Sequence, residues 1–322
     1  MTLLRKSDRP LLIAHPRPDG DAIGSTLALR LALVAVGKHP LVACVDPLPA
    51  NLAYLPGADS FLQEVPEDVD IDLVVAIDMS DLKRTGGIYR ESWRERYPLL
   101  VIDHHETNAA FGDVNLILPH AAATAMPMTD VIVGLGVAAQ DEIATCLLVG
   151  LLTDTRGLRT ETTTPEVLRA VGELIESGGD YHGVMQRTLD FVPYRTMRAW
   201  GVALDRLRLE DSMAWTTLSR SLKEELQIDD HYDLDLGNLL SRVAEAQVTA
   251  AFIEMRDGTI KVSMRSRPGY NVATVADALG GGGHKAAAGC TVDGPLETAV
   301  NRVLNLLREV VREPVDPVTS VP

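Results

Sequence analysis

Acidic and histidine side chains follow short apolar runs in the first half of the chain, and such side chains can ligate metals or transfer protons. Residues 99–108 read LLVIDHHETN, so a run of Leu, Val and Ile ends in Asp103, His104 and His105. A run of this kind is typical of a buried strand in a parallel sheet. Because ligands bind beyond the carboxyl ends of such strands, these three side chains are candidates for catalysis.

The first apolar run is followed by three more side chains of the same kind. Residues 11–15 read LLIAH, and the Pro/Gly-rich turn after His15 contains Asp19 and Asp21. Carboxylate and imidazole groups suit a hard or borderline divalent metal ion. The two acids could alternatively cap the helix that follows the turn. Capping does not account for a histidine at a strand end, so we expect a metal site.

Two further acids stand at the ends of apolar elements. Asp78 ends the apolar run over residues 72–78, and Asp154 follows a mostly apolar helical pattern over residues 141–152. The carboxyl ends of parallel strands meet at one edge of a sheet, which predicts one shared site rather than several. Two divalent ions that share a bridging carboxylate are a standard device for phosphoester hydrolysis.

The charge of this set fits two ions. Four carboxylates, those of Asp19, Asp21, Asp78 and Asp154, would neutralise two dications. Mixed carboxylate and imidazole ligation favours Mn²⁺ over Ca²⁺, with Mg²⁺ and Co²⁺ as alternatives. Attraction of a phosphate would then fall to basic groups elsewhere in the chain.

Composition excludes several classes of protein. With 322 residues, 46% of them hydrophobic and 23% charged, the chain is expected to form two globular domains. A net charge of −15 argues against binding of long duplex nucleic acid, but not against a short phosphorylated ligand.

Cys44, Cys146 and Cys290 lie far apart beside apolar runs, which predicts buried, reduced thiols. Without a signal-like or membrane-spanning segment, we expect a cytoplasmic protein that has no membrane partner.

The apolar runs predict an α/β domain over residues 1–185, with a parallel sheet and helices on both faces. Its strands are predicted at residues 11–15, 41–45, 72–78 and 99–103. Its helices are predicted at residues 26–36, 124–135 and 141–152, and from residue 165 onward. The apolar helices after Thr124 could pack in the core or in a homodimer interface, because periodicity does not distinguish the two.

Residues 186–210 are helical and arginine-rich, and we expect them to connect two domains, with one helix over residues 194–209. Residues 211–312 are expected to form a smaller α/β domain across a cleft, and residues 313–322 a disordered tail. Strands of this domain are predicted at residues 213–218, 248–254 and 259–264, and helices at residues 271–279 and 295–311.

Four consecutive glycines at residues 280–283 precede His284 and Lys285. We expect their backbone amides to bind a phosphate or carboxylate at the start of a helix, with Arg265 and Arg267 adding positive charge. A flexible loop without a ligand is the alternative.

Five motifs together resemble a known family. HPRPDGDAIGS, AIDMSD, IDHHETN and LLTDT are similar, in this order, to the four N-terminal motifs of the DHH phosphoesterase superfamily. GGGHKAAAG, preceded by SMRSR, is similar to the characteristic motif of the DHH-associated C-terminal domain. The resemblance extends from residue 11 to about residue 307. The compact chain resembles the branch of bifunctional oligoribonuclease/pAp phosphatases, also called nano-RNases.

The resemblance implies a role for each matching residue. Ligands of one metal ion would be His15, Asp19 and Asp78. Ligands of the other would be Asp21, Asp78, His104 and Asp154, so that Asp78 bridges. Asp103 would orient the histidines, and His105 would face the scissile phosphate. The other end of the substrate would contact Arg265, Arg267, Gly281, Gly282, Gly283, His284 and Lys285.

The resemblance implies a metal-dependent phosphodiesterase that hydrolyses short oligoribonucleotides to mononucleotides and also removes the 3′-phosphate of pAp. A cyclic-dinucleotide or pApA phosphodiesterase is one alternative, since the same metals would act there. A non-catalytic nucleotide-binding sensor is another, which a missing metal ligand would favour. Met79, in place of a smaller polar residue, and Arg156, in place of glycine, depart from the family pattern and bear on substrate preference.

Overall fold

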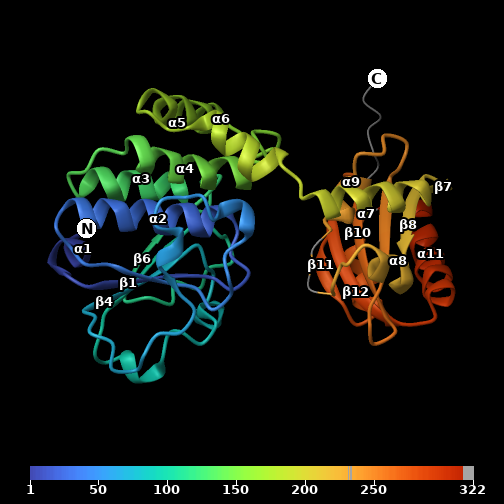
Figure 1. Cartoon of the computed structure of the whole chain (residues 1–322), viewed down its shortest axis with the longest axis horizontal. Coiled ribbons are helices and arrows are strands. Elements are labelled where there is room, and N and C mark those ends of the chain that lie inside the picture. The colour runs from blue at the N-terminus through green and yellow to red at the C-terminus, as the bar shows by residue number, and fades with distance from the viewer. Residues whose placement is uncertain (231, 233, 315–322) are drawn as a thin grey trace. The chain divides into compact units, whose positions relative to one another are not determined.

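Figure 1 shows the computed structural model of the chain, which describes residues 1–230, 232 and 234–314. The chain divides into two compact units, Met1–Phe191 and Val192–Pro322. Only the first two residues of the predicted tail at residues 313–322 lie among the described residues, so that prediction falls outside them. No helix in the described part of the chain is long and apolar enough to span a membrane.

The first unit contains a fully parallel sheet with the strand order β3-β2-β1-β4-β5-β6. The strands are β1 (Pro10–Ala14), β2 (Leu41–Ala43), β3 (Phe61–Leu62), β4 (Leu73–Ile77), β5 (Leu99–Asp103) and β6 (Val114–Ile117). All residues of β1, β4 and β5 are buried. The four predicted strands are confirmed, whereas the two edge strands were not predicted. β3 has only two residues and β6 is half exposed, so neither forms an apolar run.

Four long helices cover one face of this sheet (Figure 1). They are α2 (Gly20–Ala35), α3 (Ala125–Gly134), α4 (Asp141–Asp154) and α5 (Pro165–Glu176); α2 and α3 contact the strands, α4 packs on these two helices, and α5 packs outside α4. A Cβ on Gly24 would lie 2.3 Å from the carbonyl oxygen of Cys146, so glycine allows α2 and α4 to approach closely. This approach brings the first turn of α2 near the last turns of α4, where Asp21 and Asp154 lie.

The opposite face of the sheet is covered by loops and by the short 3₁₀ helices η3 (Leu82–Thr85) and η4 (Glu91–Trp93). Trp93 is fully buried in the apolar cluster on this face, with Tyr89 and Tyr97 packed edge-on against it. The helices expected on this face are therefore single turns, because the segment between β4 and β5 is polar and interrupted by Gly86 and Gly87. The remaining short elements of the unit are α1 (Thr2–Lys6), η1 (Ala50–Leu52), η2 (Ala58–Ser60), α6 (Tyr181–Val184) and a π-helical turn, η5 (Met185–Asp190).

The second unit contains a mixed sheet with the strand order β11-β12-β10-β9-β8-β7, in which only β8 and β9 pair in parallel. The strands are β7 (Arg208–Glu210), β8 (Met213–Leu218), β9 (Val248–Glu254), β10 (Thr259–Ser266), β11 (Gly282–His284) and β12 (Ala287–Asp293). One face packs on α10 (Ala273–Ala278) and α11 (Leu296–Arg312). The other packs on α7 (Tyr194–Asp205), α8 (Arg220–Glu225) and α9 (Leu236–Leu240).

The segment predicted as a connector belongs partly to each unit. Residues up to Asp190 complete η5 in the first unit, whereas α7 buries Ala199 and Ala203 in the second unit against Leu218. The helix ends at Asp205 rather than at residue 209, because β7 begins at Arg208 and pairs with β8.

Candidate metal centre

Three strands deliver side chains to the carboxyl edge of the parallel sheet. His15 follows β1, Asp78 follows β4, and Asp103 is the last residue of β5, with His104 next. Asp78 adopts a left-handed backbone conformation with φ of +58°. For a residue other than glycine this costs about 1–3 kcal/mol and is maintained only where the surrounding contacts enforce it. The backbone strain at Asp78 is therefore consistent with a functional position.

The first ligand cluster consists of His15, Asp19 and Asp78, whose ligand atoms all lie within 4.8 Å of one another. His15 Nε2 is 3.6 Å from Asp19 Oδ2 and 3.5 Å from Asp78 Oδ2. Asp19 is the N-cap of α2, since its carboxylate accepts the N–H of Ala22. The capping alternative is thus correct for Asp19, and the same side chain still faces His15.

The second ligand cluster consists of Asp21, His104 and Asp154, again with ligand atoms within 4.8 Å of one another. His104 Nε2 lies 3.3 Å from Asp154 Oδ2 and 4.0 Å from Asp21 Oδ2. Asp154 is the last residue of α4. Asp21 is fully buried and accepts hydrogen bonds from Ser25 Oγ and from the backbone N–H of Ala125.

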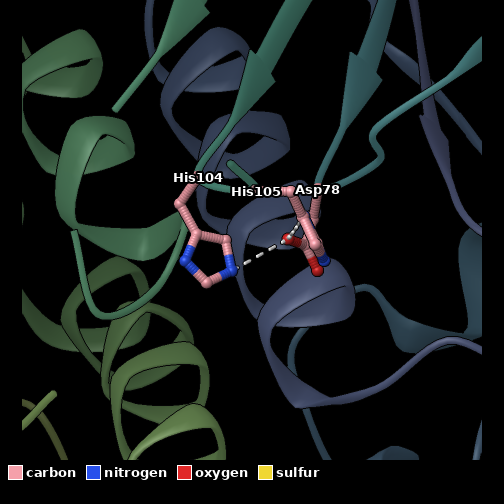
Figure 2. A group of neighbouring side chains, drawn as sticks. All are labelled: Asp78, His104 and His105. Carbon is pink, nitrogen blue, oxygen red and sulfur yellow. Dashed lines mark ion pairs between the residues drawn. The ribbon is translucent and has the colours of Figure 1, made fainter. Parts of the chain in front are cut away.

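Asp78 joins the two clusters. Its Oδ2 faces His15, while its Oδ1 lies 3.6 Å from His104 Nε2 and 3.7 Å from His105 Nδ1. Figure 2 shows the Asp78 carboxylate directed toward both histidines. One oxygen toward each cluster is the arrangement that a bridging carboxylate needs.

Hydrogen bonds leave Nε2 of His15 and His104 available to a metal ion. His15 Nδ1 lies 2.9 Å from the carbonyl oxygen of Pro16, and His104 Nδ1 lies 3.1 Å from that of Ala121. A carbonyl oxygen only accepts, so each Nδ1 carries the proton and each Nε2 has a free lone pair when the ring is neutral.

Asp103 supports the site without facing either cluster. It is fully buried, and its Oδ1 lies 2.7 Å from His105 Nδ1. Its Oδ2 accepts a hydrogen bond from the side chain of Asn108, which also donates to the carbonyl oxygen of Met79. Burial raises the pKa of Asp103, but hydrogen bonds from His105 and Asn108 outweigh it and lower the pKa below the usual range. Asn108 lies in a motif that the sequence analysis singled out, but its role required the structure.

The site holds excess negative charge. In the described part of the chain, no Lys or Arg forms an ion pair with Asp19, Asp21, Asp78 or Asp154. Burial and the charge of Asp78 raise the pKa of Asp21 well above its usual range. Asp21 and Asp78 are buried, and buried carboxylates that pair with no Lys or Arg are stable when they coordinate cations. The donor set therefore fits two divalent metal ions.

The negative charge of the site also raises the pKa values of His15 and His104. Burial lowers the pKa of His15, but hydrogen bonds with Asp19 and Asp78 outweigh it and raise the pKa to about 10. Burial likewise lowers the pKa of His104, while Asp154, Asp21 and Asp78 raise it to about 10. In the protein without metal, the raised pKa values favour the protonated form of both imidazoles.

The residues predicted to bind substrate lie in the second unit, on or next to β10, an interior strand, and β11, an edge strand of its sheet. The antiparallel register pairs Arg265 with Ala287 and Ala287 with His284, so Arg265 and His284 flank one small residue. Arg265 Nε donates to Asn238 Oδ1 at 2.9 Å. Arg267 instead contacts the backbone, with its Nη2 3.3 Å from the carbonyl oxygen of Val243.

The expectation of a helix after the glycine run is wrong. Gly282, Gly283 and His284 form β11, Lys285 lies in the turn, and β12 follows. Buried and more exposed residues alternate along β12 (AAGCTVD), as expected for a strand, and β12 pairs with β10. A Cβ on Gly281 would lie 2.2 Å from the carbonyl oxygen of Gly289, so close backbone packing explains that glycine.

Comparisons with known proteins agree with these observations. The model described as "DHH family, N-terminal domain" matches residues 10–151, and the "DHHA1 domain" model matches residues 229–313. The bifunctional oligoribonuclease and PAP phosphatase NrnA of Thermus thermophilus is 37% identical over 95% of this chain and 92% of its own.

Two other similarities are weaker. The cyclic-di-AMP phosphodiesterase GdpP of Geobacillus thermodenitrificans is 23% identical over 97% of this chain, but only over 48% of that longer relative. An exopolyphosphatase-related protein from Bacteroides fragilis has a TM-score of 0.86 at 22% identity, over 97% of this chain and 96% of its own. The latter similarity shows the fold.

Proposed function

Because this chain belongs to the DHH family and also carries a DHHA1 domain, we propose that it hydrolyses short oligoribonucleotides to mononucleotides and removes the 3′-phosphate of pAp. The matched family models confirm the resemblance predicted from the motifs, and the chain is a phosphoesterase. The substrates are those named for the Thermus relative, which aligns with nearly the whole chain. The observation that carries the proposal is the pair of ligand clusters joined by Asp78.

The acidic and histidine side chains of the first unit would act mainly as metal ligands. His15, Asp19 and Asp78 would hold one ion, and Asp78 would share the second with the set Asp21, His104 and Asp154. Two bound divalent ions would supply an activated water and stabilisation of charge on the attacked phosphate. Mn²⁺ suits this mixture of imidazole and carboxylate ligands, and we propose it as the ion.

His105 is the side chain that we propose faces the phosphate. About a third of its side chain is exposed, unlike the nearly buried His15. Asp103 lies at Nδ1 of His105, which leaves Nε2 free to donate a hydrogen bond or a proton to a phosphate oxygen. The Asp103 carboxylate raises the pKa of His105, which favours the protonated, phosphate-binding form.

The second unit would select short substrates. We propose that Arg265, Arg267, His284 and Lys285, with the backbone of Gly281, Gly282 and Gly283, contact the end of the substrate that is not being cleaved. The net charge of −15 disfavours long nucleic acid, so a short ligand fits better. We also propose that the enzyme acts in the cytoplasm.

A cyclic-dinucleotide phosphodiesterase is the second candidate, because the similarity to GdpP covers 97% of this chain. The same clusters could act on either substrate. The Thermus relative has the higher identity and aligns over 92% of its own length, against 48% for GdpP, which favours oligoribonucleotides.

A substrate panel tests the proposal. Purified protein with MnCl₂ is given pApA, a five-nucleotide RNA, a ~24-nucleotide RNA (longer than one short binding groove), pAp and cyclic di-AMP, and the products are quantified. We expect rapid turnover of the two short RNAs and of pAp, with little product from the long RNA. Fastest turnover of cyclic di-AMP would support the second candidate, and binding without turnover of any substrate would indicate a sensor.

A further inference from the structure

Thr124 is fully buried beside the metal centre, yet none of the matching motifs contains it. Its hydroxyl donates a hydrogen bond of 2.9 Å to Asp78 Oδ1. Its backbone N–H donates to Asp21 Oδ2. One residue therefore contacts a carboxylate from each ligand cluster.

The hydroxyl of Thr124 can donate to Asp78 because it does not cap α3. The carboxylate of Asp21 accepts N–H groups at the start of that helix. Thr124 is the N-cap of α3, a position where a threonine side chain normally accepts an N–H from its own helix. Here it forms no capping hydrogen bond. The carboxylate of Asp21 accepts the N–H groups of Thr124 and Ala125 instead.

The orientation of the Asp78 carboxylate determines whether it can bridge. Its Oδ2 lies 3.5 Å from His15 Nε2, and its Oδ1 lies 3.6 Å from His104 Nε2. The terminal torsion of an aspartate is broad, so rotation about Cβ–Cγ would move both oxygens away from their clusters. The only side-chain hydroxyl that contacts this carboxylate among the described residues is that of Thr124.

We propose that Thr124 is a positioning residue, whose hydroxyl fixes the plane of the Asp78 carboxylate so that each oxygen serves one metal ion. The inference rests on the proposed two-ion site. Loss of a hydrogen bond to a metal ligand commonly lowers metal affinity or activity by about 10–100-fold.

The experiment compares variants of Thr124 in the full chain. Thr124→Val keeps the shape but removes the donor, and Thr124→Ser keeps the donor. Thr124→Ala repeats the test without a methyl group against Asp78, should valine prevent folding. Thr26→Val is the matched control, because Thr26 is a buried threonine on α2 whose hydroxyl has no hydrogen-bond partner among the described residues.

MnCl₂ is titrated into each metal-free protein by calorimetry, and the spin coupling between bound Mn²⁺ ions is followed by electron paramagnetic resonance. We expect wild type, Thr124→Ser and Thr26→Val to bind two coupled ions. Thr124→Val should bind at least one ion about 10–100-fold more weakly, with altered coupling. Thermal unfolding of the metal-free proteins separates this effect from loss of the fold.

If Thr124→Val bound Mn²⁺ with wild-type affinity and spin coupling, the proposed role of Thr124 would be overturned. An equal loss of Mn²⁺ affinity in Thr124→Ser or in Thr26→Val would overturn it as well. Failure of the wild-type protein to bind two Mn²⁺ ions would instead refute the two-ion site itself. The two failures are therefore distinguishable.

Discussion

Gly150, on α4, provides a test of how helix packing holds the metal centre. A Cβ on Gly150 would lie 2.4 Å from Asp21 Oδ1 and 2.8 Å from the Cβ of Ala125. Gly150→Ala must therefore displace the Asp21 carboxylate or the start of α3. Gly172, on α5, has nothing within 4 Å of the corresponding position, so Gly172→Ala is the matched control.

The expected magnitudes follow from two opposing effects on the free energy of unfolding. Each substitution gains about 1 kcal/mol of helix propensity. Nothing opposes this gain at Gly172, whereas overpacking at Gly150 costs about 1–3 kcal/mol. We therefore expect Gly150→Ala to be less stable than Gly172→Ala by about 1–3 kcal/mol. Because Asp21 is a proposed ligand, Gly150→Ala should also bind Mn²⁺ about 10–100-fold more weakly.

Urea unfolding followed by far-UV circular dichroism in the presence of a chelator measures the stability difference, and calorimetric titration with MnCl₂ measures the affinity. If Gly150→Ala gained as much stability as Gly172→Ala and bound Mn²⁺ like wild type, the close approach of α4 to Asp21 would not matter. That result would refute the packing argument. Equal Mn²⁺ affinity with reduced stability would refute only the link to the metal centre.

Four further predictions concern the site and the second unit. Asp78→Ala should abolish turnover of pApA with the circular dichroism spectrum unchanged, and retained turnover would exclude a bridging role. Because the pKa values of His15 and His104 are raised to about 10 without metal, Mn²⁺ binding should release protons near neutral pH and weaken as pH falls. Calorimetry in buffers of different ionisation enthalpy measures this release. The same raised pKa values stabilise the metal-free fold fully below about pH 6.5, and this contribution should be lost as pH rises toward 10, which chelator-treated unfolding checks. Arg265→Ala should raise KM for pApA more than it lowers kcat, and an unchanged KM would exclude substrate contact.

Much of the fold is predictable from the sequence because its central strands are continuous apolar runs. β1, β4 and β5 are buried along their whole length, so their composition alone indicates them. The edge strands β3 and β6 carry no such pattern, since they are short or half exposed. The glycine run at residues 280–283 was misinterpreted for a related reason. Its conformation depends on pairing with β12 and β10, which local composition does not report.

The candidate ligands were predictable because each follows an apolar element, and parallel topology brings the strand ends to one edge. The sequence by itself therefore determined which side chains meet: His15, Asp19, Asp21, Asp78, His104 and Asp154. Only the tertiary structure decided how they are held. Thr124 reaches Asp78 across 46 residues of chain and Asp21 across 103. Contacts at such separations depend on the packing of α3 against α2 and β5, and no local periodicity encodes that packing.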